Sequence, residues 1–195
     1  MSRKALFCID IQYALALDPD TRVPHAERLQ AAGAKILAAA RAIIDQHASR
    51  GKPSPILIFV VQHEEAEGGE LVRGTKAWEL VFEPRDVADE VLVAKTHGNT
   101  FESNPNLIGE LRAKGVSEIV AFGIQSDFCV TKTTLGALEA GFPVTVLSGA
   151  HTTYDEGGRT AAEIEEDVNR NLAAKGAKVV PWEDVIATWE KNFTI

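Results

Sequence analysis

The sequence predicts an α/β fold built on a mostly parallel sheet. Short apolar runs of strand character alternate along the chain with longer segments in which apolar residues recur at helical spacing. The strand-like runs are apolar almost throughout, as is typical of strands that are covered on both faces. A length of 195 residues without a linker, repeat or low-complexity tract predicts a single domain over residues 1–195.

The first half of the chain opens with a strand at 5–9 that ends at Asp10. A long helix follows Pro24 and ends at Gly51. Its apolar positions form one stripe, made of Leu29, Ala32, Ile36, Leu37, Ala40, Ile43 and Ile44. A second strand covers 56–61.

The polar segment 62–90, rich in Gly and Glu, predicts a long loop that builds or covers a site. The alternation of strands and helices then resumes. The remaining predicted elements, in order, are a strand at 91–93, a helix at 105–114, a strand at 119–122, a helix from Phe128 or Cys129 to Ala140, a strand at 144–147, a helix with Ala161, Ile164, Val168 and Leu172 on one face, a strand at 177–180 and a short terminal helix.

Composition excludes several classes of partner. The hydrophobic fraction of 45% and charged fraction of 25% are those of a soluble globular protein. A net charge of −8 argues against binding to nucleic acid or to an anionic membrane surface. No segment approaches the roughly 20 apolar residues that span a bilayer. The two cysteines, Cys8 and Cys129, indicate no disulfide framework, so we expect a reducing cytoplasm.

Three reactive side chains follow the ends of predicted strands. Asp10 ends the first strand, Lys95 lies just beyond the third, and Cys129 lies just beyond the fourth. In an open parallel sheet, functional residues gather at the carboxyl ends of the strands. We therefore expect these three side chains to lie within reach of one another.

Cys129 lies at a strand-to-helix junction within 123–130. A helix N-terminus and a nearby lysine lower a thiol pKa from about 8.5 to roughly 3.5–7.5, so this setting predicts a reactive thiol. The alternative is a small buried hydrophobe, and that interpretation is favoured for Cys8, which lies inside an apolar strand. Taken alone, Asp10 could also be a turn-stabilising residue and Lys95 a solvated one.

The pattern indicates no metal or organic cofactor. Of the five histidines, His63 precedes two glutamates, but no second histidine lies at a usual ligand spacing. His63 and His151 are the histidines expected to line a pocket. The first strand leads into Gln12 and Tyr13 instead of a glycine-rich turn, so a Rossmann cofactor site is not expected.

Together these residues resemble the isochorismatase-like cysteine hydrolase superfamily, which includes nicotinamidases, N-carbamoylsarcosine amidase, isochorismatases and streptothricin hydrolase-like amidases. The resemblance runs from Ala5 to about Val185. It rests on Ile9-Asp10-Ile11-Gln12, on Lys95 ahead of Asn99-Thr100-Phe101, on Gly123-Ile124-Gln125-Ser126-Asp127-Phe128-Cys129-Val130, and on Ser148–Asp155. It implies a three-layer αβα sandwich with a six-stranded parallel sheet, and a homo-oligomer that is a dimer or tetramer.

The resemblance also assigns roles to individual residues. Cys129 is then the nucleophile, Asp10 the general base and Lys95 the support for both. The family carries a cis peptide upstream of the cysteine, here Ile124–Gln125, and the backbone N–H groups of Gln125 and Cys129 form the oxyanion hole. The reaction requires no cofactor. Gln62, His63 and Glu64 do not reproduce the metal-binding Asp and His that nicotinamidases place after the second strand, so no metal is expected.

The leading hypothesis is hydrolysis of a small amide or related C–N bond through a thioester. The expected pocket residues are Gln12, His63, Trp78, Phe101, Gln125 and Phe128. One alternative is an isochorismatase that hydrolyses a vinyl ether by proton transfer from Asp10, chemistry that does not need a thiol nucleophile. Another is a non-catalytic binding protein on the same fold.

Overall fold

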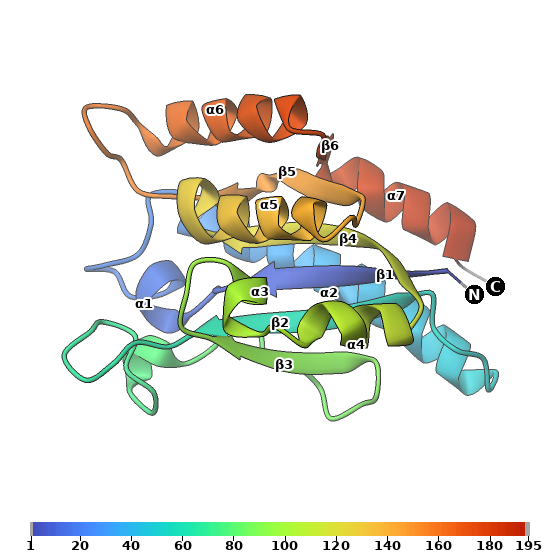
Figure 1. The fold of residues 1–195 in the computed structure, drawn as a ribbon. Coiled ribbons are helices and arrows are strands. Elements are labelled where there is room, and N and C mark those ends of the chain that lie inside the picture. Colours follow the sequence, from blue (N-terminus) through green and yellow to red (C-terminus); the bar gives the residue numbers. More distant parts are fainter. Residues whose placement is uncertain (1, 194–195) are drawn as a thin grey trace.

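Six parallel strands form one sheet in the order β3-β2-β1-β4-β5-β6 (Figure 1). This computed structural model describes residues 2–193. The strands are β1 (Arg3–Ile9), β2 (Ile56–His63), β3 (Glu90–Lys95), β4 (Val116–Ile124), β5 (Val144–Thr152) and β6 (Lys178–Pro181). The predicted α/β class and parallel sheet are confirmed.

Helices cover both faces of the sheet, so the fold has three layers, with the sheet between two layers of helices (Figure 1). Their bounds are α1 (Tyr13–Ala16), α2 (Ala26–Ser49), α3 (Thr100–Ser103), α4 (Leu107–Ala113), α5 (Thr131–Glu139), α6 (Ala161–Ala174) and α7 (Trp182–Phe193). A short 3-10 helix, η1 (Lys76–Trp78), and a π-helical turn, η2 (Ser126–Val130), complete the set. None of the helices in residues 2–193 has the length and apolarity that crossing a bilayer requires.

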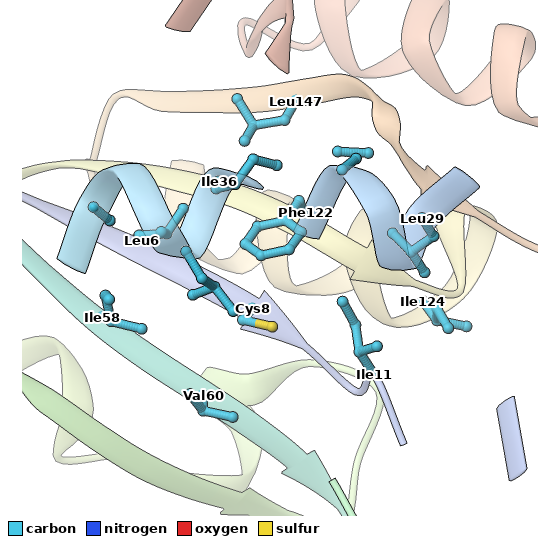
Figure 2. Packing of buried hydrophobic residues seen from close by; sticks show 14 of the residues in the cluster. Leu6, Cys8, Ile11, Leu29, Ile36, Ile58, Val60, Phe122, Ile124 and Leu147 are labelled. Atoms are coloured by element: carbon cyan, nitrogen blue, oxygen red, sulfur yellow. The ribbon is translucent and has the colours of Figure 1, made fainter. Parts of the chain in front are cut away.

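Two hydrophobic cores lie on opposite faces of the sheet. Leu6 and Cys8 of β1 point toward α2 and pack with Ile36, as Figure 2 shows. Phe7, the residue between them, points to the other face and packs beneath α3 to α6. Because successive side chains of a strand point to opposite faces, a strand covered on both must be apolar at every position. The structural interpretation of Cys8, which is 1% exposed, is confirmed.

The largest departure from the predicted elements is in β5, which continues past Leu147 to Thr152. A register irregularity separates the pairing of Val146 from that of His151, and Gly149 takes a positive φ of 79° within it. A bulge that needs a glycine looks like a strand end in the sequence, so the expected end at Leu147 was wrong. The short helix α3, capped by the side chain of Asn99, was not predicted.

The strand order reverses between β1 and β4, where the first crossover connections leave the sheet in opposite directions. Ile9 pairs with Gly123 at this point, so the chain leaves both strands side by side. An open α/β sheet forms a crevice at such a reversal, beyond the carboxyl ends of the strands. The fold therefore directs Asp10 and the segment after Gly123 into one crevice.

Gly123 allows this close approach of two backbones. Its φ is +136°, and a Cβ at this position would lie 2.1 Å from the carbonyl oxygen of Ile9. Gly141 also has a positive φ, +83°, but a Cβ there would meet nothing within 4 Å. The two glycines thus share a backbone constraint, and only Gly123 adds a steric one.

We predict that Gly123→Ala lowers the free energy of unfolding by at least about 2 kcal/mol more than Gly141→Ala, measured by urea denaturation. The control carries only the left-handed penalty of about 1–2 kcal/mol, whereas Gly123→Ala adds overpacking against fixed backbone. Equal losses for the two variants would show that the β1–β4 contact tolerates a methyl group.

Candidate active site

The structure brings Asp10, Lys95 and Cys129 together at the carboxyl edge of the sheet. The Lys95 Nζ lies 2.7 Å from Asp10 Oδ2 and donates to Cys129 Sγ at 3.2 Å. Asp10 follows β1 with a φ of 51°, Lys95 ends β3, and Cys129 lies in η2. Asp10 and Lys95 are 1% exposed and Cys129 is 7% exposed. The predicted juxtaposition is thus present as a buried cluster.

The Lys95 ammonium is held by two further acceptors. It contacts His63 Nδ1 at 3.1 Å and donates to the carbonyl oxygen of His97 at 3.1 Å. His63 ends β2 and is the register partner of Lys95. Burial and the charge of Lys95 lower the pKa of His63, so its ring is neutral and Nδ1 accepts the bond. A buried ammonium is thereby surrounded by a carboxylate, a ring nitrogen, a carbonyl and a sulfur.

Asp10 retains an oxygen with spare capacity. Within residues 2–193, its buried Oδ1 has no hydrogen-bond partner, while Oδ2 faces Lys95. An unpartnered buried carboxylate oxygen is expensive unless a proton donor reaches it during function. The arrangement suits a general base that must accept a proton inside a closed site.

The sequence predicted a lowered pKa for the Cys129 thiol, and the structure gives a raised one. Burial, and after it the negative charge of Asp10, raise its pKa to about 12 against the opposing charge of Lys95. The helical segment begins at Ser126, so Cys129 lies almost one turn inside it instead of at its first residue. The expected reactive thiolate is therefore wrong for the resting site, which holds a neutral thiol beside an available base.

A cavity of about 100 Å³ opens onto the cluster. It is lined by Asp10, Leu15, His63, Glu65, Glu70, Leu71, Ile124, Gln125, Phe128 and Cys129. This volume is small beside the roughly 300–1,000 Å³ of drug-sized sites. Phe128 is a lining residue that is 45% exposed, and Lys132 Nζ lies 3.9 Å from the centroid of its ring. A cavity of this volume has room for a small chemical group beside Cys129.

His63, Gln125 and Phe128 line the cavity as expected, and the structure places the other expected pocket residues elsewhere. Gln12 is fully buried. Its Nε2 donates to the backbone carbonyls of His63 and Trp78, and its Oε1 accepts from the backbone N–H of His63. Both N–H donors of that amide tie the loop after β2 to the sheet, and its burial keeps it out of reach of a ligand in the cavity.

Phe101 and His151 are likewise corrected. Phe101 packs in the core, with its ring centroid 6.0 Å from that of Phe7. Trp78 packs against the opposite core and is not among the residues lining the cavity. His151 is 1% exposed because β5 continues through it, which turns its side chain into the interior.

Sequence reasoning missed Glu65, Glu70 and Leu71 as cavity residues. All three lie in the 62–90 loop, where Glu65 Oε2 accepts from the backbone N–H groups of Glu70 and Leu71. The composition of the loop predicted that it covers a site, but not which residues face inward. The contacts depend on a local turn closed by one carboxylate.

Two further features of the site concern the peptide bond before Gln125 and the arrangement of metal-ligating side chains. The bond between Ile124 and Gln125 is cis, at the position where the family resemblance puts one. Gln125 and Cys129, whose backbone N–H groups the resemblance assigns to an oxyanion hole, both line the cavity. Within residues 2–193, no group of three His, Cys, Asp or Glu side chains is arranged to hold a metal ion.

The chain is similar in sequence to a known protein family and to a curated protein. The family model described as isochorismatase domain matches residues 4–184. A streptothricin hydrolase from Streptomyces noursei is 29% identical over 175 residues, covering 90% of this chain and 58% of the relative. The chain therefore spans little more than half the length of that relative.

Two solved structures share the fold. An isochorismatase-like hydrolase from Alkaliphilus metalliredigens has a TM-score of 0.79 at 22% identity, covering 96% of this chain and 99% of the other. A cysteine hydrolase from Pseudomonas syringae pv. phaseolicola 1448A has a TM-score of 0.80 at 21% identity, covering 97% and 93%. At these identities the likeness concerns the fold.

We predict that Asp10→Asn accelerates alkylation of Cys129 by iodoacetamide at pH 8–9, because removal of the carboxylate charge lowers the thiol pKa from about 12. Peptide mass spectrometry would follow Cys129 separately from buried Cys8. The matched control is Glu65→Gln, which removes a carboxylate from the same cavity. An unchanged rate in Asp10→Asn would contradict the electrostatic assignment.

Proposed function

The chain belongs to the isochorismatase family, a family of hydrolases, and we propose that within it this protein is a cysteine hydrolase that cleaves a small amide. The observation that carries the proposal is the buried contact of Lys95 with both Asp10 and Cys129 at the base of a cavity. A buried acid, base and thiol in one cavity are the components of nucleophilic catalysis.

The first chemical step begins with the neutral thiol. As Cys129 attacks the amide carbon, its proton moves to Asp10, whose Oδ1 is unpartnered within the described residues. The developing thiolate remains 3.2 Å from the Lys95 ammonium, which stabilises its charge in a low-dielectric site. The high resting pKa is therefore compatible with attack, because the base is already in place.

Formation of the C–S bond moves the carbonyl electron pair onto oxygen. We assign the stabilisation of this oxyanion to the backbone N–H groups of Gln125 and Cys129, each worth about 10²–10³ in rate. Collapse of the tetrahedral intermediate breaks the C–N bond, and Asp10 returns its proton to the leaving amine. A water molecule, deprotonated by Asp10, then hydrolyses the thioester and regenerates the thiol.

The charge of the cavity favours an amide over isochorismate. Lys95 offsets the charge of Asp10 at 2.7 Å, which leaves Glu65 and Glu70 as the unopposed charges of the lining, and no Lys or Arg is among its lining residues within the described chain. Isochorismate is a dicarboxylate, so its binding would oppose this field. A neutral or amine-bearing amide meets no such repulsion, and one relative of the chain is a streptothricin hydrolase.

We predict ammonia or amine release from at least one member of a panel of small amides, ureas and lactams, and a loss of at least about 10³-fold in Cys129→Ala. Cys8→Ala, which removes the buried thiol remote from the cavity, should keep kcat within about twofold of the wild type. Colorimetric ammonia assays and mass spectrometry of the products give both numbers.

Trapping of a thioester adduct on Cys129 in an acid-quenched reaction would support the covalent route. Turnover that survives in Cys129→Ala would overturn it. Hydrolysis of isochorismate by the wild type, with no amide turned over, would transfer the proposal to vinyl-ether chemistry with Asp10 as proton donor.

A further inference from the structure

A buried chain of hydrogen bonds joins the catalytic turn to the neighbouring strand and helix. Ser126, the first residue of η2, places its Oγ 2.7 Å from His151 Nδ1. The other ring nitrogen, His151 Nε2, lies 2.9 Å from Asn169 Oδ1 in α6. Three elements that are distant in the sequence therefore meet through one imidazole.

The direction of this chain follows from the groups involved. Burial lowers the pKa of His151, so its ring is neutral and carries one proton. With the amide oxygen of Asn169 as acceptor, that proton resides on Nε2. Nδ1 must then accept from the hydroxyl of Ser126, which leaves the serine with a single favoured rotamer.

A second bond ties the next residue of the same turn to the same strand end. Thr153 Oγ1 donates to Asp127 Oδ1 at 2.6 Å, and Thr153 is 2% exposed. We call the four residues Ser126, Asp127, His151 and Thr153 the β5 clamp. Two consecutive residues of η2 are thus held by two residues on alternate positions beyond the bulge of β5.

The arrangement of serine, histidine and asparagine resembles a hydrolytic triad, but its location excludes that role. Ser126 is fully buried and is not among the residues that line the active cavity. A nucleophile must reach its substrate, and this hydroxyl faces a histidine inside the protein. The bonds instead act on the turn that carries Cys129.

We propose that the β5 clamp positions Cys129 between Asp10 and Lys95, with His151 and Thr153 as positioning residues; this inference rests on the proposed cysteine chemistry. Cys129 follows Ser126 by three residues inside the same five-residue π-helical turn, so a displacement of Ser126 is transmitted to the thiol. Asp10 and Lys95 approach from β1 and β3, on the far side of the crevice. Within residues 2–193, the clamp bonds are the side-chain hydrogen bonds that join η2 to β5 and to Thr153 just beyond it.

Misplacement by about 1 Å can cost about 10²-fold in rate, so loss of either bond should reduce kcat more than it raises KM. The test compares Ser126→Ala and Thr153→Val with Thr145→Val. Thr145 lies at the opposite end of β5 and loses an equivalent bond, from its Oγ1 to Glu118 Oε1 at 2.8 Å. Urea denaturation would measure the stability of the three variants, so that a loss of activity can be separated from a loss of folding.

We expect kcat on the best amide of the panel to fall at least about tenfold in Ser126→Ala and Thr153→Val, with KM within about threefold. Thr145→Val should keep both constants, and Ser126→Thr, which retains the hydroxyl, should recover most of kcat.

A second readout uses iodoacetamide and requires no turnover, so it tests the clamp even if the amidase proposal fails. A displaced thiol loses part of its burial and leaves the neighbourhood of Asp10, so its alkylation profile should move from a midpoint near 12 toward the ordinary value of about 8.5. Ser126→Ala and Thr153→Val should thus be alkylated at least tenfold faster than Thr145→Val at pH 9. Coincident profiles for all three variants would overturn the proposal.

Discussion

The site depends on a buried positive charge. Lys95 is 1% exposed, and an ammonium removed from water requires compensation by charge and hydrogen bonds. Its side-chain partners come from the ends of two strands and a helical turn, with Asp10 after β1, His63 at the end of β2, and Cys129 in η2. Each of these groups has a second role in shaping the cavity. The charge of one lysine thereby determines where a base, a neutral imidazole and a thiol must lie.

In the proposed mechanism, the same charge explains how a thiol that rests protonated can serve as a nucleophile. Burial and Asp10 oppose ionisation of Cys129, whereas Lys95 favours it. Transfer of the proton to Asp10 reverses the balance, because the carboxylate loses its charge as the sulfur gains one. The net charge of the cluster stays constant during this transfer, so little solvent rearrangement is required.

Most of the fold could be predicted from the sequence because burial on both faces makes each strand of the interior recognisable. The positions of Asp10, Lys95 and Cys129 followed from parallel topology, which collects carboxyl ends at one edge. Gln12 and His151 could not be assigned in the same way. Both look like ligand-binding side chains, and both satisfy buried groups of the protein itself. A sequence shows that a polar residue is near an edge, but not which partner its side chain meets.

The groups of the proposed active site belong to segments that are far apart along the chain, and Gly123 can meet Ile9 only when β1 and β4 have paired. These contacts are non-local, so they form late relative to the helices and hairpin-length contacts of a folding chain. A nascent chain that has completed β1 to β3 holds the base and the ammonium but no nucleophile. The thiol therefore joins the base and the ammonium only when the central strands β1 and β4 pair, which would couple the onset of the proposed activity to closure of the middle of the sheet.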